Sequence, residues 1–586
     1  MNFIYRKKAY IKEQMKVLSR SIQTSMGIMK WDFISMFFIK LAFALLPLLG
    51  IYLNRELFQG ISNYDFTERT IVIIILYCFY LLVTRLEVVI YDRYYLQFQS
   101  LLKFEKEIKL LLHKKCSQIG LIHFDVQEHH LLTLQAQQAS INIYRITEII
   151  INLITSGVGI ITISVYFMKI SLLYIVFILL ASVPTLLEET LGTVKREKRI
   201  KEFLQIERRE DAIRSLMTSP RYIHEIKSFN IHDFLMGKWK QVGEEKEMEE
   251  RALNKELSKI EYLFNFITLI GNAGGFIMAV GFYLNRGNFG QFTATIAAFG
   301  IISGFTSRIS ELFAYLNMFT IRVKPYFTLM DQDKQKGNQI HTKLTDGISL
   351  KDVSFKYINS DTWVLNNINL HIERGQTIAL VGRNGSGKTT LSKLILGLYQ
   401  PQVGALFYDG YSIEDISEEN FFTNKSAVFQ DFCKYPLTLI ENISLGKEIN
   451  KDSLAEIQAY LNDFNINYDK DLLLGKEFGG SDLSGGEWQK LAIIRSIVKG
   501  GEIVLFDEPT SAIDPLQEAK IYERLENLFQ NKTGIIVTHK LSSIQYADRI
   551  IVLDKGKIIE EGRHEELVNK DGLYAQMYRA QLSNYI

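Results

Sequence analysis

The sequence predicts two fold classes in one chain: an all-α membrane domain of six transmembrane helices with long cytoplasmic extensions, then an α/β phosphate-loop domain. Three observations carry this prediction. The apolar runs of the 586-residue chain crowd into residues 30–320. A glycine-rich phosphate loop and an acidic strand end lie in the remainder. Between those two motifs, Ser484-Gly485-Gly486 precedes a helical run, and the free N–H groups at such a helix start bind anions.

Composition and charge limit the kinds of partner and site that the protein can have. A net charge of +2 gives no sign of a nucleic-acid partner. The cysteines are three in number and far apart, so they form no metal or disulfide pattern. The N-terminal twenty residues are basic and partly amphipathic, and no short apolar core with a cleavage site follows them. They are therefore expected to form an interfacial helix rather than a signal peptide.

Six apolar stretches each hold the roughly 20 apolar residues that a bilayer core requires. They are residues 29–53, 70–91, 141–168, 171–191, 262–284 and 289–316. One such run is compatible with a buried helix of a soluble protein, but six runs of this length argue against that alternative. We therefore expect a membrane domain over residues 1–330.

The loops between these stretches alternate in length. Residues 92–140 and 192–261 form long loops that are rich in Lys and Arg and helical in period, whereas the other loops are short. Because positive charge stays cytoplasmic, both termini and both long loops are expected inside. Each long loop reads as two helices that continue past the membrane and turn back, near 120–125 and 218–222. The tips can press on a cytoplasmic motor; the alternative is an ordinary surface turn.

Few ionisable residues fall inside the spans. Lys40, Glu148, Arg308 and Glu311 lie in the inner half, and they are candidates to line a cavity open to the cytoplasm. Arg308, for example, lies about 28 Å along a helix that starts near Phe289. The alternative is snorkelling or an intramembrane ion pair. Three glycines of the fifth span favour close helix packing and need no ligand: Gly271, Gly274 and Gly275.

The pattern changes after a polar linker over residues 331–345, and strands begin near residue 346. A segment between an apolar strand and a helix matches G-x-x-x-x-G-K-[ST]. Its backbone N–H groups can surround phosphates, Lys388 can reach the β- and γ-phosphates, and the Thr389 hydroxyl can ligate Mg²⁺. The candidate ATP-binding residues here are Gly382, Arg383, Asn384, Gly385, Ser386, Gly387, Lys388, Thr389 and Thr390.

Further polar residues at strand ends complete a hydrolytic set. Asp507 ends a buried strand and suits the metal, while Glu508 is free to act as general base on an attacking water. His539 also ends a strand and can contact the γ-phosphate, and Gln430 can offer its amide to Mg²⁺ or water. Taken singly, the two acids can be a helix cap, the histidine can be structural, and the glutamine carries no signal.

The ordered set resembles the ATP-binding cassette (ABC) ATPases over about residues 346–579. The resemblance implies a signature at Leu483–Glu487, a D-loop at Ser511–Asp514 and an adenine-stacking role for Tyr357. Six spans ahead of one cassette resemble an ABC exporter half-transporter of type IV fold. In that family two chains meet head to tail, so a homodimer is implied. Each ATP then lies between one chain's phosphate loop and the other chain's signature residues, here Ser484, Gly485, Gly486 and Glu487, with Asp514 nearby.

A finer resemblance is to lanthipeptide exporters of Gram-positive bacteria, carried by the run Gln430–Tyr435 (QDFCKY) and by Trp488. It implies export of a modified peptide across the bacterial cytoplasmic membrane, with a peptide-modifying enzyme complex as a further partner. Only about thirty residues precede the first span, and none is Cys, so we expect no N-terminal cysteine peptidase of the kind that other bacteriocin exporters carry. The chain departs from the family in Glu487, where glutamine is commonest, and in residues 475–482.

The expected function is thus ATP hydrolysis coupled to outward transport, with ATP and Mg²⁺ as cofactors, in a multi-pass protein of the lipid bilayer. A peptide is the favoured substrate. Export of lipids or hydrophobic drugs by the same machine is the alternative. An ATP-gated channel or a membrane-tethered signalling ATPase is an alternative of another class, and no residue favours it.

Overall fold

A computed structural model describes residues 2–63, 68–86, 99–168, 170–332, 343–358, 360–417, 421–476, 479–510, 513, 517–518, 521, 523, 529–540 and 544–582. The chain folds as two compact units. One comprises Met1–Lys115 with Leu132–Asp331, and the other comprises Cys116–Leu131 with Gln332–Ile586.

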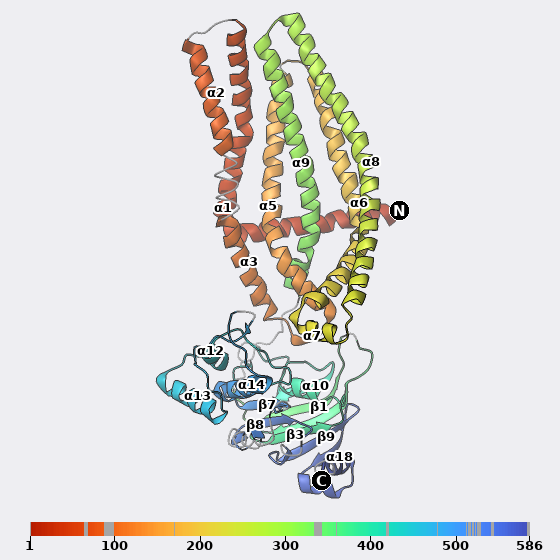
Figure 1. The fold of residues 1–586 in the computed structure, drawn as a ribbon, viewed down its shortest axis with the longest axis vertical. Coiled ribbons are helices and arrows are strands. Elements are labelled where there is room, and N and C mark those ends of the chain that lie inside the picture. Colours follow the sequence, from red (N-terminus) through yellow and green to blue (C-terminus); the bar gives the residue numbers. More distant parts are fainter. Residues whose placement is uncertain are drawn as a thin grey trace. The chain divides into compact units, whose positions relative to one another are not determined.

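The first unit consists of long helices (Figure 1). They are α1 (Asn2–Ser62), α2 (Glu68–Leu86), α3 (Leu101–Cys116), α5 (Gln127–Met168), α6 (Leu173–Thr218), α7 (Pro220–Ser228), α8 (His232–Arg286) and α9 (Phe289–Met330). Among the described residues, α1, α2, α5, α8 and α9 are long and apolar enough to cross a membrane. The stretch predicted as the fourth span lies on α6, where the described residues include a shorter apolar segment, Val176–Thr185.

Helix α1 combines the expected interfacial segment with the first apolar stretch. The two parts meet at Met29, whose backbone is non-helical (φ −138°, ψ 55°), and Figure 1 shows the first part running across the other helices. Two ion pairs hold this part to the C-terminal end of α9. Arg20 pairs with Asp331 at 2.6 Å, and Lys324 pairs with Glu13 at 2.6 Å.

Two expected helix limits differ from those observed. Helix α1 continues to Ser62, nine residues past the predicted end of the first span at residue 53. Polar residues can extend a helix beyond the apolar core, since water satisfies their side chains. Helix α2 is described as far as Leu86, and the remainder of the predicted second span, residues 87–91, lies outside the described residues.

The second charged loop folds as an antiparallel pair formed by α6 and α8. Opposite charges on the two helices face each other and join them along their polar length. The pairs are Lys195–Glu256 at 3.4 Å, Arg199–Glu249 at 3.0 Å, Arg209–Glu245 at 2.9 Å and Lys246–Glu210 at 2.8 Å. Three of the basic residues that predict a cytoplasmic loop, Lys195, Arg199 and Arg209, thus pair with acids on the facing helix.

Helices α6 and α8 also approach closely in their apolar parts. A Cβ atom added at Gly271 would lie 2.6 Å from the backbone nitrogen of Ala181, so no larger residue fits. The expectation that this glycine serves helix packing is confirmed.

The second unit contains two sheets. The strands are β1 (Gly347–Phe355), β2 (Leu365–Glu373), β3 (Thr377–Gly382), β4 (Val403–Tyr408), β5 (Tyr411–Ser412), β6 (Lys425–Val428), β7 (Ile503–Asp507), β8 (Thr533–Val537), β9 (Arg549–Asp554) and β10 (Lys557–Gly562). An antiparallel sheet has the order β2-β1-β4-β5, and a larger sheet has the order β10-β9-β3-β8-β7-β6. Strands β9, β3, β8, β7 and β6 are parallel, so their carboxyl ends share one edge of the sheet.

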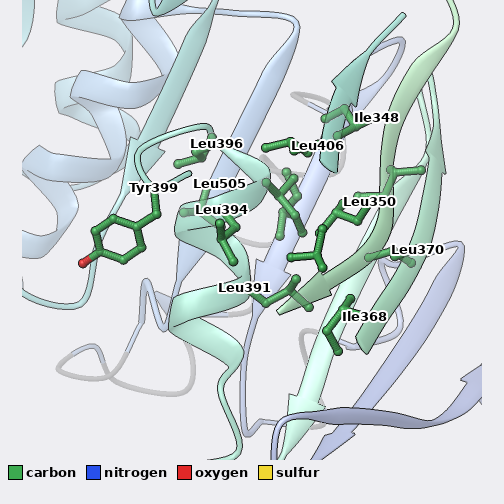
Figure 2. Packing of buried hydrophobic residues seen from close by; sticks show 14 of the residues in the cluster. Ile348, Leu350, Ile368, Leu370, Leu391, Leu394, Leu396, Tyr399, Leu406 and Leu505 are labelled. Carbon is green, nitrogen blue, oxygen red and sulfur yellow. The ribbon is translucent and has the colours of Figure 1, made fainter. Parts of the chain in front are cut away.

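The helices of this unit are α4 (Leu121–Phe124), α10 (Lys388–Ile395), α12 (Leu439–Ser444), α13 (Lys451–Asp463), α14 (Gly485–Lys499), α17 (His564–Asn569) and α18 (Leu573–Leu582). Figure 2 shows how α10 fills the space between the two sheets: Leu391 and Leu394 face Leu350 and Leu406. These side chains are at most 2% exposed. The core therefore fixes the start of α10, where the phosphate loop ends.

Helix α4 belongs to this second unit although its sequence neighbours α3 and α5 belong to the first. The membrane domain predicted over residues 1–330 is thus interrupted by Cys116–Leu131. Leu121 and Ile122 pack against the hydrophobic core that contains Tyr399, and the Tyr399 hydroxyl donates a hydrogen bond to Asp125. The predicted turn at 120–125 is present, with Gly120 at the start of α4, and the turn at 218–222 is present between α6 and α7.

Candidate ATP site

The phosphate loop connects β3 to α10 at the edge where the parallel strands end. Its conformation requires glycine: Gly385 has φ +75°, Gly387 has φ +103°, and a Cβ at Gly382 would lie 2.1 Å from the Leu553 carbonyl oxygen. Open space surrounds the Cβ position of Gly385, and Arg383 and Asn384 are exposed beside it. The Ser386 hydroxyl is buried and has no hydrogen-bond partner among the described residues. A buried hydroxyl without a partner, in a glycine-rich loop with open space around it, fits a bound phosphate.

The Lys388 ammonium group lies where it can bind an anion. Its Nζ donates to the carbonyl oxygens of Gly382 at 2.9 Å and Arg383 at 3.0 Å, and the residue is 7% exposed. Burial lowers the pKa of Lys388, and the carboxylates of Glu508 and Asp507 partly oppose that shift. An incoming phosphate can replace the carbonyl oxygens as the partner of Nζ. Its negative charge would stabilise the protonated form of Lys388, which burial destabilises.

Two carboxylates follow β7. Asp507 is 2% exposed, and its carboxylate accepts a hydrogen bond from Thr389 at the start of α10. Burial raises the pKa of Asp507 to about 6, and the neighbouring charge of Glu508 adds to the shift. Two adjacent acids in a buried site favour a bound cation. The Thr389 hydroxyl and the Asp507 carboxylate are oxygen donors of the kind that Mg²⁺ prefers, so these residues fit the predicted metal.

Glu508 leaves the strand in an unusual conformation. Its φ is +47°, a left-handed value that non-glycine residues rarely adopt. Two hydrogen bonds hold its backbone there: its N–H donates to Val537 at 2.9 Å, and its carbonyl accepts from Gln489 at 3.3 Å. The bend directs the carboxylate out of the sheet and toward His539, whose Nε2 lies 3.3 Å from Oε1.

His539 is in its neutral form near pH 7. Burial lowers the pKa of His539, and the nearby charge of Lys388 lowers it further, against the opposing effect of Glu508. A neutral imidazole can donate one hydrogen bond and accept another. The structure therefore brings together Lys388, the adjacent pair Asp507 and Glu508, and His539, which come from three distant parts of the sequence.

The predicted signature forms the start of α14. The Ser484 hydroxyl accepts from the Glu487 N–H at 3.3 Å, and the Glu487 carboxylate accepts from the Ser484 N–H at 2.8 Å, which is a reciprocal capping box. The other oxygen of Glu487 accepts from the Tyr468 hydroxyl at 3.1 Å. The S-x-x-E spacing indicates this capping role of Glu487, which the prediction of an ATP-binding residue did not include.

Trp488 is buried immediately behind the signature. Only 1% of it is exposed, and its Nε1 donates to Asp482 at 2.9 Å. The Lys434 ammonium lies 5.9 Å from the Trp488 ring, and the Arg495 guanidinium lies 4.7 Å from the Tyr435 ring. The two segments that indicate a lanthipeptide exporter, QDFCKY and the run after the signature, thus pack against each other.

The remaining predicted residues lie in four places. The Tyr357 hydroxyl contacts the Thr390 hydroxyl at 3.0 Å, next to the phosphate loop. Gln430 is exposed just after β6. Asp514 lies outside the described residues, and Ile513 is the only D-loop residue within them. In the membrane unit, Lys40 and Arg308 line one cavity, and Glu148 and Glu311 are not among its described lining residues.

Comparison with known proteins identifies this arrangement. Residues 365–511 match the family model described as ABC transporter, which covers the phosphate loop, the signature and the β7 carboxylates. A solved structure of a bacterial Atm1-family ABC exporter with ATP bound has the same fold, with a TM-score of 0.77 and 19% identity over 95% of this chain and 98% of that one. The chain thus contains an ABC transporter ATPase domain and has the fold of an ABC exporter half-transporter.

Curated relatives of the exporter fall into two groups. The subtilin transport ATP-binding protein SpaT of Bacillus subtilis is 27% identical over 91% of this chain and 89% of its own length. The nisin transport ATP-binding protein NisT of Lactococcus lactis is 29% identical over 62% of this chain and 63% of its own length. The ATP-dependent lipid A-core flippase 2 of Colwellia psychrerythraea is 37% identical over 51% of this chain and 52% of its own length. The exporter hydrolyses ATP to drive transport, and it is a multi-pass membrane protein.

Proposed function

We propose that the exporter moves a modified peptide outward across a bacterial cytoplasmic membrane. The observation that supports a peptide is the extent of the similarity to the subtilin transport protein, which includes most of the membrane helices as well as the ATPase unit. The match to the lipid A-core flippase covers about half of each chain. The QDFCKY run and Trp488, which resemble lanthipeptide exporters, also lie close together in this chain.

A second copy of the chain is the proposed partner. In the described part of the chain, no hydrogen bond joins Ser484–Glu487 to the phosphate loop, and Glu487 is used within its own unit. The exposed N-terminus of α14 is then available to an ATP held by the phosphate loop of the partner. The Lys- and Arg-rich long loops support a cytoplasmic location for both termini and both ATPase units.

The site residues have the following proposed roles. The phosphate-loop N–H groups and Lys388 bind the phosphates, and Tyr357 contacts the adenine. Thr389, Gln430 and Asp507 hold Mg²⁺, which supplies charge neutralisation at the β- and γ-phosphates. Glu508 accepts the proton of the attacking water, and His539 contacts the γ-phosphate while holding the Glu508 carboxylate in place.

Transport into inside-out vesicles tests the substrate class. Wild-type protein is expected to accumulate a modified, leader-bearing peptide when ATP is present, and Glu508→Gln protein is expected to bind ATP but lose at least about 100-fold in turnover and all accumulation. Movement of a lipid A-type lipid with no peptide accumulation would instead favour the flippase-like function. Full turnover in Glu508→Gln would overturn the proposed role of Glu508.

A further inference from the structure

The last described helix, α18, packs on the sheet that carries the ATP site (Figure 1). Tyr574 of this helix is 1% exposed and lies in one apolar cluster with Ala379 and Val381 of β3, the strand that leads into the phosphate loop. The Tyr574 hydroxyl also forms a hydrogen bond of 2.6 Å with Nδ1 of His564. Helix α18 is therefore fixed to a central strand of the ATPase sheet.

Gln581 lies on the face of α18 that packs against the sheet. Residues spaced three and seven apart share one face of a helix, so Tyr574, Met577 and Gln581 lie along one line. Met577 packs against the same apolar cluster that contains Tyr574. Gln581 follows these two residues and is only partly exposed. The apolar face of α18 thus ends in a polar side chain that points toward the sheet.

The Gln581 side chain reaches the histidine of the ATP site. Its Nε2 donates a hydrogen bond to the backbone carbonyl of His539, which is 42 residues away in the sequence. Strand β8 ends at Val537, so His539 lies beyond the hydrogen-bonded ladder. None of the backbone N–H groups in the described part of the chain donates to the His539 carbonyl. A carbonyl beyond the end of a strand needs a partner of its own, and Gln581 is that partner.

The residue after His539 is held by a different part of the unit. The Lys540 ammonium donates to the Thr510 carbonyl at 3.0 Å and to the Glu518 carboxylate at 2.8 Å. Glu518 is 6% exposed, and it also accepts a hydrogen bond of 2.9 Å from the Thr510 hydroxyl. The bend that carries His539 is thus attached at Lys540 to the residues that follow the β7 carboxylates, and at His539 itself to α18.

We propose that Gln581 is a positioning residue for ATP hydrolysis, which orients His539 through its backbone carbonyl. Nε2 of His539 lies 3.3 Å from Oε1 of Glu508. A rotation of the His539 peptide group would therefore move the imidazole away from that carboxylate and from the γ-phosphate. The side chain at position 581 must donate, which a glutamate of the same size cannot do. The inference rests on the proposed role of His539, and it is independent of the transported substrate.

Basal phosphate release by the full-length exporter in nanodiscs tests the proposal. Gln581→Ala is expected to lower kcat by about tenfold and to leave the half-saturating ATP concentration within about twofold. Gln581→Glu keeps the size of the side chain without the donor and should show the same loss. Gln581→Lys retains a donor of similar reach and should restore at least about half of the wild-type kcat. Gln576→Ala, which removes an exposed glutamine of the same helix, is the matched control and should retain the wild-type kcat.

Combination with His539→Ala separates positioning of the histidine from a role in folding alone. If Gln581 acts through His539, Gln581→Ala should reduce the residual turnover of the His539→Ala protein by less than about twofold. An equal loss in both backgrounds, or a wild-type kcat in Gln581→Glu, would overturn the proposal. If Gln581→Ala fails to fold, Gln581→Glu and Gln581→Lys provide the same comparison. Wild-type turnover in His539→Ala would overturn the role of His539 and this inference with it, whereas an equal loss in both backgrounds overturns this inference alone.

Discussion

At the position of Glu487, a carboxylate and an amide can make the same contacts. Glu487 accepts from the Ser484 N–H and the Tyr468 hydroxyl. A glutamine oxygen can accept the first bond, and its NH₂ group can donate to the tyrosine oxygen. Its departure from the commonest residue of the family therefore leaves the capping box intact.

We expect Glu487→Gln to change the free energy of unfolding by less than about 0.5 kcal/mol and to leave ATP-coupled transport unchanged. Glu487→Ala removes both bonds and should cost about 1 kcal/mol, or a fall in Tm of about 2–4 °C. Thermal unfolding of the three proteins measures the difference. A large loss of stability in Glu487→Gln would show that its negative charge is needed.

Asp507 gives the ATP site a predictable pH dependence. Its pKa is raised to about 6, so the carboxylate is charged above that pH and becomes neutral as the pH falls through it. Only the charged form attracts Mg²⁺ strongly. Mg²⁺-dependent ATP affinity is therefore expected to fall as the pH is lowered through about 6.

Fluorescent-nucleotide titrations between pH 5 and 8 measure this effect. Asp507→Asn is the control, because it retains the protonation of the nucleotide itself and removes that of the carboxylate. The variant should bind more weakly at pH 7 and show a shallower pH profile. An identical profile in both proteins would exclude Asp507 as the titrating group.

At the scale of elements, α4 is the segment of the membrane half that folds with the ATPase unit. The buried Tyr399 donates a hydrogen bond to Asp125, and Leu121 and Ile122 pack against the core of that unit. Tyr399 is 1% exposed, and burial followed by the bond to Asp125 raises the pKa of its hydroxyl. The tyrosine also lies on the loop after α10, in the same core as Leu391 and Leu394 of that helix.

Tyr399→Phe is expected to reduce peptide transported per ATP by about tenfold, because the variant loses a hydrogen bond to a charged group worth about 1.5 kcal/mol. Basal ATPase activity should stay within about twofold. Transport and phosphate release in the same proteoliposomes give the ratio. Tyr460→Phe, which removes an exposed Tyr–Glu456 bond of the same unit, should leave the ratio unchanged.

At the scale of the whole molecule, the proposed head-to-tail dimer makes each ATP site a composite of two chains. A chain with Lys388→Ala and a chain with Gly485→Asp should each be inactive as homodimers. A mixed dimer retains one site with an intact phosphate loop and an intact signature. We expect mixing before reconstitution to restore about a quarter of the wild-type ATPase activity, since half of the dimers are mixed and each has one working site of two.

Phosphate release measured across a series of mixing ratios checks this expectation. Activity should be greatest at equal amounts of the two chains. A control mixture of Lys388→Ala with Glu508→Gln should stay inactive, because each chain then lacks a residue of its own phosphate-loop half. No recovery in the first mixture would contradict the composite site.

The sequence alone determined the order of the domains and the chemistry of the ATP site. Both are encoded locally: spans by the length of apolar runs, the phosphate loop by glycines next to Lys388, and the signature by a helix start. The membrane domain followed by an α/β ABC ATPase is confirmed by the fold comparison.

Only the tertiary structure decided which distant residues meet. In the parallel sheet, Lys388 lies near the carboxylates that follow β7, and Glu508 points toward His539. Helix α4 belongs to the ATPase unit. The tertiary structure also put Lys40 and Arg308 at one cavity without Glu148 or Glu311. Span length and hydropathy fix how deep a residue lies along its helix. The helix rotation and the neighbouring helix that decide its contacts depend on packing across the whole unit.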